Sequence, residues 1–378
     1  MSDNSIVDKL NVAHRIDINT THDCIERAIR DGKLDLEFSA LPGPTEATLL
    51  DLINTYPPKK ILERLDKYVI KQGEAKKEAA LITYYHMQKI ANANKLNLPS
   101  QSLFMVGPTG CGKTEIWRAI QKIIPDIKIK IVDGSRITPE GWKGQYKVND
   151  IIAEFEDANY TGILVVDEFD KVVAGNKTRP EDILYSNTIQ SAFLKILEGD
   201  TVSIVSENSP CSSFDEVSTE NLTVVFLGAF SNLRTEKRNS SKSIGFMESV
   251  EATNKPLCTD DLIKYGVMPE LAGRITSIVE LSPLDREDYN SIISSPYGEV
   301  RELVLLLNDL RVQKTDEVLP KSIIDSAIED AIKLNTGARG AVKGVERYLM
   351  GQLMDVDPED IKASSYNRLV DAYMTQEE

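Results

Sequence analysis

A short glycine-rich segment has the residue types and the spacing needed to bind a chain of phosphates. It follows the pattern G-x-x-x-x-G-K-[ST], in the run Gly107, Pro108, Thr109, Gly110, Cys111, Gly112, Lys113 and Thr114. Glycines at these positions let successive backbone N–H groups curve around a phosphate, and a helix beginning near Lys113 would point its positive dipole end at the same charge. In such a loop the lysine reaches the β- and γ-phosphates, and the threonine hydroxyl binds Mg²⁺. Because an apolar run precedes the segment and a helical pattern follows it, we interpret it as a phosphate-binding loop rather than a chance glycine turn.

Two adjacent carboxylates are the second candidate for chemistry. Asp167 and Glu168 directly follow the apolar run Ile163 to Val166. At the carboxyl end of a buried strand, Asp167 would hold Mg²⁺ directly or through water, and Glu168 would polarise an attacking water molecule. The interval from Lys113 to Asp167 contains one further apolar run, which is expected when the two strands are not neighbours. This arrangement favours an ATPase that does mechanical work over a GTPase switch; a plain acidic cap on the strand is the alternative.

The elements that must position these residues can be read from the apolar pattern. Short runs rich in Val, Ile and Leu alternate with helical segments: Leu103 to Val106, Ile127 to Val132, Ile163 to Val166, Leu222 to Leu227 and Ile275 to Leu281. Such runs predict a buried parallel sheet with helices on both faces. After Ser282-Pro283 the pattern is purely helical, with apolar stripes at Leu303, Leu306, Leu307 and Leu310 and at Ile324, Ala327, Ile328 and Ala331. We therefore expect an α/β domain followed by a small, mainly helical domain.

Breaks in the pattern suggest four parts. Residues 1–55 form an N-terminal block of unknown role, with a short capped helix expected from Thr20 to Gly32 and a break at Tyr56-Pro57-Pro58. Residues 56–283 form the large α/β domain, 284–365 the small helical domain and 366–378 a tail. The first block is too small to hold much core by itself, so it would pack on its neighbour or serve as a docking module.

Composition limits the classes of function. The chain has 378 residues and a net charge of −15, with 41% hydrophobic and 27% charged residues, which is ordinary for a globular protein. No apolar stretch approaches about 18 residues, so no membrane span is expected. The acidic balance makes nucleic acid an unlikely partner. The four cysteines and three histidines form no cluster with zinc-ligand spacing, and scattered cysteines suit a reducing compartment, so a cytoplasmic protein without zinc is expected.

Over about residues 56 to 350 the sequence resembles the AAA+ unfoldases of the ClpX type, which feed proteins to the ClpP peptidase. The similar segments are Leu65 to Gln72, Ala192 to Gly199, Gly228 to Phe230, Pro269 to Arg274 and Thr336 to Gly340. The resemblance implies an AAA+ P-loop core that uses ATP and Mg²⁺, with Val69 and Ile70 packing on adenine. It also implies that Arg339 acts on the γ-phosphate of its own subunit and Arg274 on that of the neighbouring subunit, so that hydrolysis requires a ring, expected to be a homohexamer. In isolation, either arginine could equally form a surface or interdomain ion pair.

Two further segments bear on partners. Trp142 stands between glycines where the resemblance places an axial pore loop that grips a polypeptide, although a lone tryptophan also suits packing. Ile244, Gly245 and Phe246 match the loop that docks ClpX-type rings onto a ClpP-like peptidase; the alternative is a loop that folds its own phenylalanine inward. The sequence thus predicts an ATP-dependent unfoldase that threads unfolded or tagged proteins. A remodelling ATPase without a peptidase is the first alternative, and a nucleic-acid loader is the second.

The chain also departs from the family pattern. The zinc domain of ClpX is not expected in residues 1–55, and the basic pore-entrance loop is replaced by the polar stretch Ser206 to Glu216. Leu227 replaces a glycine, so no polar sensor-1 residue can be assigned, and Lys71 stands where the family has glycine. Recognition of the usual degradation tags is therefore not expected.

Overall fold

The structure is a computed structural model that describes residues 46–93, 95–139, 142, 146–173, 179–205, 214–231, 233, 256–310 and 319–355. Its centre is a five-stranded sheet in the order β2-β3-β6-β1-β7, in which every pairing is parallel. The strands are β1 (Ser102–Val106), β2 (Ile129–Asp133), β3 (Gly162–Asp167), β6 (Leu222–Gly228) and β7 (Ser277–Glu280). All five predicted strands are confirmed. Because β6 lies between β1 and β3, the strand before the phosphate loop and the strand ending in Asp167 are not neighbours, as expected.

Both faces of this sheet are buried, because successive side chains of each strand point to opposite sides. Phe104, Leu164 and Phe226 belong to one hydrophobic core. Their neighbours along the same strands, Met105 and Val165, belong to the other. The near-continuous apolar runs in the sequence follow from this double burial.

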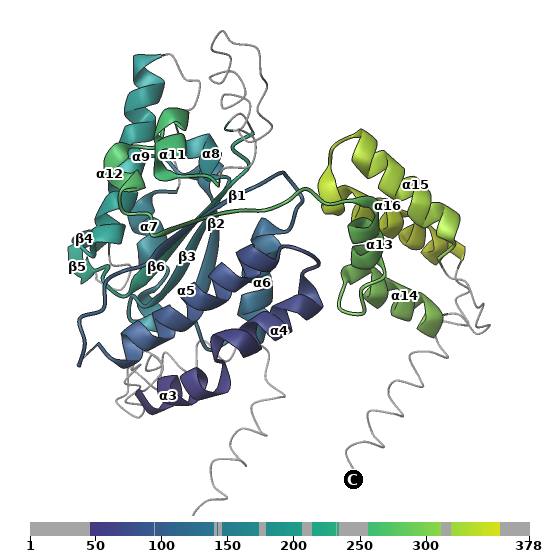
Figure 1. The fold of residues 1–378 in the computed structure, drawn as a ribbon, viewed down its shortest axis with the longest axis horizontal. Helices are drawn as coiled ribbons and strands as arrows, with labels where there is room; N and C mark the ends of the chain where they lie inside the picture. Colours follow the sequence, from purple (N-terminus) through teal and green to yellow (C-terminus); the bar gives the residue numbers. More distant parts are fainter. Residues whose placement is uncertain are drawn as a thin grey trace, which may run out of the picture. The chain divides into compact units, whose positions relative to one another are not determined.

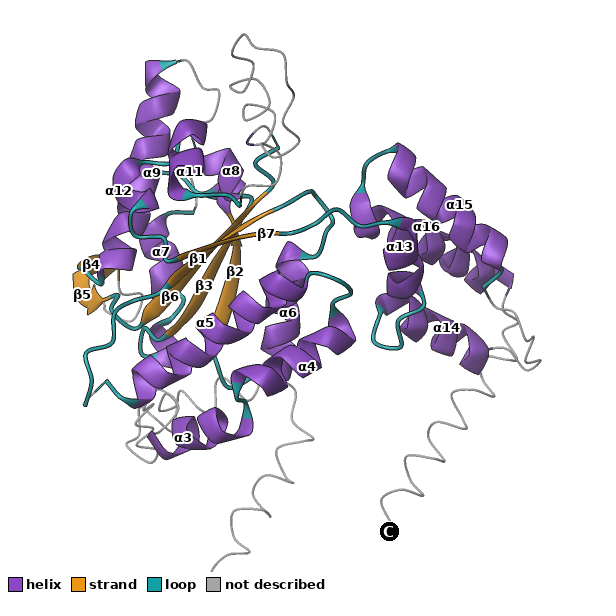
Figure 2. Cartoon of the chain, in the orientation of Figure 1, coloured by secondary structure: helices purple, strands orange, loops and turns teal. Residues whose placement is uncertain are grey.

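Helices cover the two faces, as Figures 1 and 2 show. One layer contains α3 (Glu46–Thr55), α4 (Pro58–Tyr68), α5 (Gly73–Ala91) and α6 (Lys113–Ile123). The other contains α7 (Val148–Ala153), α8 (Phe169–Val172), α9 (Pro180–Glu198), α11 (Thr259–Tyr265) and α12 (Pro269–Ala272), with short 3₁₀ turns at Gly134–Arg136 and Glu156–Ala158. None of the helices in the described ranges has the length and apolar character needed to cross a bilayer.

A separate helical core follows the sheet. It is built from α13 (Arg286–Ile293), α14 (Glu299–Leu310), α15 (Lys321–Lys333) and α16 (Gly337–Gln352), which ends in a 3₁₀ turn at Leu353–Asp355. The apolar stripes predicted for α14 and α15 supply Leu307 and Ile328 to this core, where they meet Val345 and Leu349 of α16. The small, mainly helical domain is therefore confirmed.

The sequence patterns did not reveal a second, two-stranded sheet. β4 (Thr201–Val205) and β5 (Phe214–Ser218) pair in antiparallel fashion, with Val202 opposite Val217. Only one face of this two-stranded sheet carries buried apolar residues, so apolar and polar residues alternate along β4. Such short alternating segments are weaker indicators of a strand than a continuous apolar run.

Candidate nucleotide site

The phosphate loop lies where the sequence predicts it, between the end of β1 and the start of α6. Gly110 and Gly112 have φ angles of 74° and 103°, a left-handed conformation that glycine adopts without strain. The side chain of Lys113 is held against the loop, because its Nζ donates hydrogen bonds to the carbonyl oxygens of Gly107 (2.7 Å) and Pro108 (2.8 Å). A buried ammonium group and the positive end of α6 therefore lie together at the glycine-rich turn, which suits an anion.

Thr114 at the start of α6 and Asp167 at the end of β3 meet beside the loop, although β6 lies between β1 and β3. The hydroxyl of Thr114 donates a hydrogen bond of 2.6 Å to Oδ2 of Asp167, and Oδ1 of Asp167 accepts one from the backbone N–H of Glu168 (2.9 Å). A hydroxyl next to a carboxylate forms the oxygen-rich donor set that Mg²⁺ prefers. The backbone of Glu168 is left-handed, with φ 53°, and its carboxylate lines the adjoining cavity. Such strain in a residue other than glycine is common at functional sites.

The segment after α4 forms the apolar end of the site. Val69 is buried, and its carbonyl oxygen accepts a hydrogen bond from Lys76 Nζ (2.9 Å). Val69 lies against the phosphate loop, since a Cβ added at Gly112 would stand 3.6 Å from its Cγ1. Val69 and Ile70 line the same cavity as four apolar residues of the helical domain, namely Leu284, Ile292, Val300 and Val342.

The backbone of the first turn of α16 contacts the backbone of the phosphate loop. Ala338 N–H donates a hydrogen bond of 3.1 Å to the carbonyl of Gly110. Gly337 has φ 67°, and a Cβ there would lie 2.5 Å from the carbonyl oxygen of Thr109. Arg339, which follows Ala338, is exposed in the cavity and forms no hydrogen bond or ion pair with any residue that the structure describes. Its guanidinium is thus available to an anion on the loop.

These groups line one cavity of about 610 Å³ between the α/β core and the helical domain. This volume lies within the usual range for a small-molecule site, about 300–1,000 Å³. A phosphate loop, an Mg²⁺ donor pair, a free guanidinium and an apolar end together fit a nucleoside triphosphate. No group of three or more His, Cys, Asp or Glu in the described part of the chain could hold a metal ion alone. A cation here would therefore need water or phosphate oxygens as further ligands, which is usual for Mg²⁺.

Comparison with known proteins agrees with this geometry. Residues 98–278 match the AAA domain (Cdc48 subfamily). The ClpX subunit of Treponema denticola, an ATP-dependent Clp protease ATP-binding subunit, is 29% identical over 353 residues, covering 87% of this chain and 84% of the relative. The subunit of the same name from Porphyromonas gingivalis is 26% identical over 357 residues, covering 87% and 85%. Over most of its length the chain is therefore similar to the ClpX subunits, and its core is similar to the AAA domain.

The two candidate arginines lie toward opposite ends of β1. The carbonyl of Arg274 accepts a hydrogen bond from Ser102 Oγ (2.8 Å) at the start of β1, and its guanidinium pairs with Glu198 (2.7 Å). The phosphate loop begins at the other end of β1, and five residues of strand span about 16 Å. Arg339 therefore shares the cavity with the phosphate loop, whereas Arg274 of the same chain does not.

Trp142 is 47% exposed. Its ring meets that of Tyr185 on α9 edge-on, with centroids 5.3 Å apart and planes at 89°. Tyr185 is anchored in turn by a hydrogen bond from its hydroxyl to the carbonyl of Ile137 (3.1 Å). The flanking glycines lie outside the described residues, and so do Ile244, Gly245 and Phe246, so the roles given to these segments stay predictions.

Sequence reasoning missed two residues around the cavity, Tyr297 and Glu346. The ring of Tyr297 contacts that of Tyr68, in the similar segment Leu65 to Gln72, with centroids 5.4 Å apart and planes tilted at 52°. Glu346 on α16 also lines it, and burial together with a hydrogen bond that its carboxyl group donates to Glu299 raises the pKa of that group. No local motif marks these residues, because each gains its place only when the helical domain meets the core.

Proposed function

We propose that this chain hydrolyses ATP in a ring of identical subunits, expected to be a hexamer, and uses the energy to unfold protein substrates. The observation that carries the proposal is the single cavity in which the phosphate loop, Asp167, Glu168 and Arg339 meet, built jointly by the core and the helical domain. A site shared by two domains couples the state of the nucleotide to the angle between them. The likeness to ClpX over 87% of the chain supports a protein substrate.

Each residue has a role that its position supports. Lys113 and the backbone N–H groups of the loop bind the β- and γ-phosphates. Thr114 and Asp167 hold Mg²⁺, which when bound neutralises charge on the phosphates. Glu168 orients a water molecule and accepts its proton. Arg339 stabilises the negative charge that develops on the transferred phosphoryl group.

The position of Arg274 supports the proposed ring. Its guanidinium is exposed near the amino end of β1, away from the phosphate loop that follows the carboxyl end of the same strand. In a closed ring, a surface of this kind can face the nucleotide site of the next subunit. We propose that Arg274 completes that neighbouring site, so that an isolated subunit hydrolyses ATP poorly.

The substrate path and the peptidase contact rest on two loops. We propose that the exposed ring of Trp142 contacts the polypeptide in the axial pore, and that Ile244, Gly245 and Phe246 dock into a ClpP-like peptidase. An apolar tripeptide in a polar stretch is costly to expose unless a partner covers it. Both relatives are named as subunits of an ATP-dependent Clp protease, which supports this partner.

An ATPase assay tests the proposal directly. The rate of ATP hydrolysis is measured alone, with an unstructured protein such as casein, and with single-stranded or double-stranded DNA. We expect stimulation by casein and none by DNA; strong stimulation by DNA alone would overturn the choice of protein as substrate. Deleting Ile244 to Phe246 then separates the two protein-directed functions, because degradation with a ClpP-like peptidase should fail while ATP-driven unfolding continues.

A further inference from the structure

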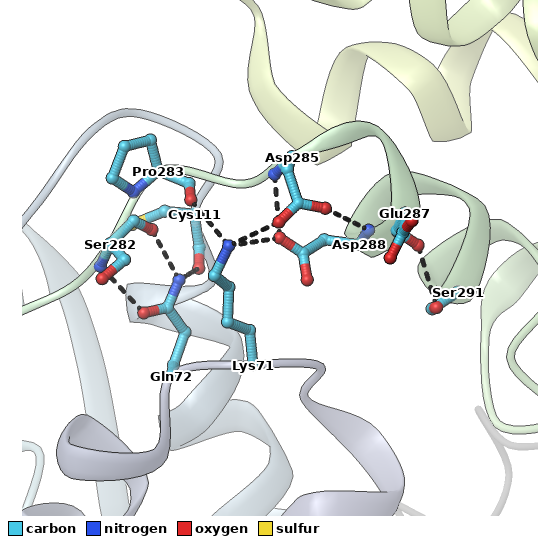
Figure 3. Close-up of polar contacts among 9 residues, drawn as sticks. All are labelled: Lys71, Gln72, Cys111, Ser282, Pro283, Asp285, Glu287, Asp288 and Ser291. Atoms are coloured by element: carbon cyan, nitrogen blue, oxygen red, sulfur yellow. Dashed lines mark hydrogen bonds and ion pairs between the residues drawn. The ribbon is translucent and has the colours of Figure 1, made fainter.

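Two consecutive residues other than glycine adopt the left-handed conformation at the edge of the nucleotide cavity. Lys71 has φ 62° and Gln72 φ 56°, directly after Ile70 of the apolar segment and directly before α5. The left-handed region is costly for residues with a Cβ, so strong contacts must hold both residues there. Figure 3 shows that both side chains reach toward the linker into the helical domain.

Gln72 ties the phosphate loop to this linker. Its side chain is buried, and Nε2 donates hydrogen bonds to the carbonyl of Cys111 in the phosphate loop (3.1 Å) and to the carbonyl of Ser282 (2.8 Å). Its Oε1 accepts a hydrogen bond from Ser282 N–H (3.0 Å). One amide group thus joins two segments that are more than 150 positions apart in sequence.

Lys71 extends the tie to the first helix of the helical domain. Its Nζ donates to the carbonyl of Pro283 (3.2 Å) and pairs with Asp285 (3.0 Å) and Asp288 (2.6 Å), which begin α13 (Figure 3). The two aspartates also cap the helix, since the backbone N–H of each donates to the carboxylate of the other. The ammonium group of Lys71 balances the negative charges of the two aspartates. Its hydrogen bonds to Asp288 and Asp285 raise the pKa of Lys71.

We propose that Lys71 is a positioning residue of the ATPase: together with Gln72 it forms a clasp onto Ser282, Asp285 and Asp288 that fixes the angle of the helical domain. This inference rests on the nucleotide site proposed above. Lys71 directly follows the segment expected to pack on the base, and α13 packs against α16, the helix that carries Arg339. The clasp therefore links the base end of the cavity to the arginine at its phosphate end.

The contribution of the Lys71 charge can be tested separately from that of its left-handed backbone. Lys71→Ala removes the charge, Lys71→Arg keeps it, and Lys71→Gly removes it while relieving the left-handed strain. Lys77→Ala is the matched control, because Lys77 lies nearby on α5, is exposed, and pairs with Glu74 of its own helix at 3.7 Å.

The first readout is hydrogen exchange of residues 282–288 in the nucleotide-free protein. We expect exchange about five-fold faster in Lys71→Ala and in Lys71→Gly, and unchanged in Lys71→Arg and Lys77→Ala. The same acceleration should appear in the wild type at high salt, because salt screens a partly exposed ion pair. Wild-type exchange in both Lys71→Ala and Lys71→Gly would overturn the clasp, and it would do so whether or not the chain hydrolyses ATP.

The second readout is the steady-state ATPase rate. Because the clasp is argued to position Arg339, kcat should fall by about five-fold in Lys71→Ala and Lys71→Gly, with a smaller change in KM. Lys71→Arg should restore kcat. A wild type without ATPase activity would contradict the proposed function, whereas an active wild type with an equally active Lys71→Gly would contradict the positioning role.

Discussion

Replacing Gly337 by alanine should separate the helical domain from the phosphate loop. The added Cβ would lie 2.5 Å from the carbonyl oxygen of Thr109 and 2.6 Å from Cα of Gly110, and backbone atoms cannot rotate out of the way. The left-handed φ of 67° costs alanine about 1 kcal/mol. Breaking the hydrogen bond from Ala338 N–H to Gly110 costs about 1 kcal/mol more.

A total of about 2 kcal/mol lowers the equilibrium constant for contact between α16 and the loop by about 30-fold, since 1.36 kcal/mol corresponds to a factor of ten. Arg339 is carried by the same turn, so kcat for ATP hydrolysis should fall by a similar factor. The matched control is Gly351→Ala, in the same helix, where an added Cβ meets nothing within 4 Å. It should keep wild-type kcat and gain up to about 1 kcal/mol of stability from helix propensity. A Gly337→Ala variant within two-fold of wild-type kcat would refute this reasoning.

Three further predictions use other parts of the structure. Glu168→Gln should bind ATP normally and hydrolyse it about 10²–10⁴-fold more slowly in a steady-state assay; vigorous turnover would mean that the base is misassigned. Trp142→Ala should keep its ATPase rate and lose unfolding of a folded reporter, and equal unfolding by the variant would remove the pore assignment. Burial lowers the pKa of His86 from 6.5 to about 3, so the folded chain takes up its proton later than the unfolded chain does as pH falls. The contribution of this pKa shift to the free energy of unfolding is complete above pH 6.5 and declines toward pH 3. About 2 kcal/mol of it is lost by pH 5. In urea unfolding, His86→Asn should lose less stability than the wild type between pH 7.5 and 5, and an identical loss in both proteins would show that His86 does not titrate in this way.

Local patterns were sufficient to predict the sheet and the helical domain. Apolar runs such as Ile163 to Val166 identify buried strands because burial on both faces leaves no polar alternation. The spacing of glycines before Lys113 identifies the phosphate loop for an equally local reason: adjacent backbone groups bind the anion. The pairing of Thr114 with Asp167 then follows once parallel strands bring their carboxyl ends to one edge.

Contacts between distant segments could not be predicted. Lys71 and Asp288 are 217 positions apart, and neither belongs to a motif that names its partner. Gly337 was recognised as part of a similar segment, yet its positive φ and its contact with Thr109 depend on how α16 approaches the loop. The sequence therefore indicates which groups do chemistry, while the structure shows how the helical domain is held against them.

The central claim is that ATP hydrolysis at this cavity drives protein unfolding. The most direct measurement follows the fluorescence of a stably folded reporter that carries an unstructured casein-like tail, with the wild-type chain and with Lys113→Ala. Unfolding should be seen with the wild type in the presence of ATP and Mg²⁺, and it should be lost without ATP and in Lys113→Ala. Full ATP hydrolysis by the wild type with no loss of reporter fluorescence would contradict the account.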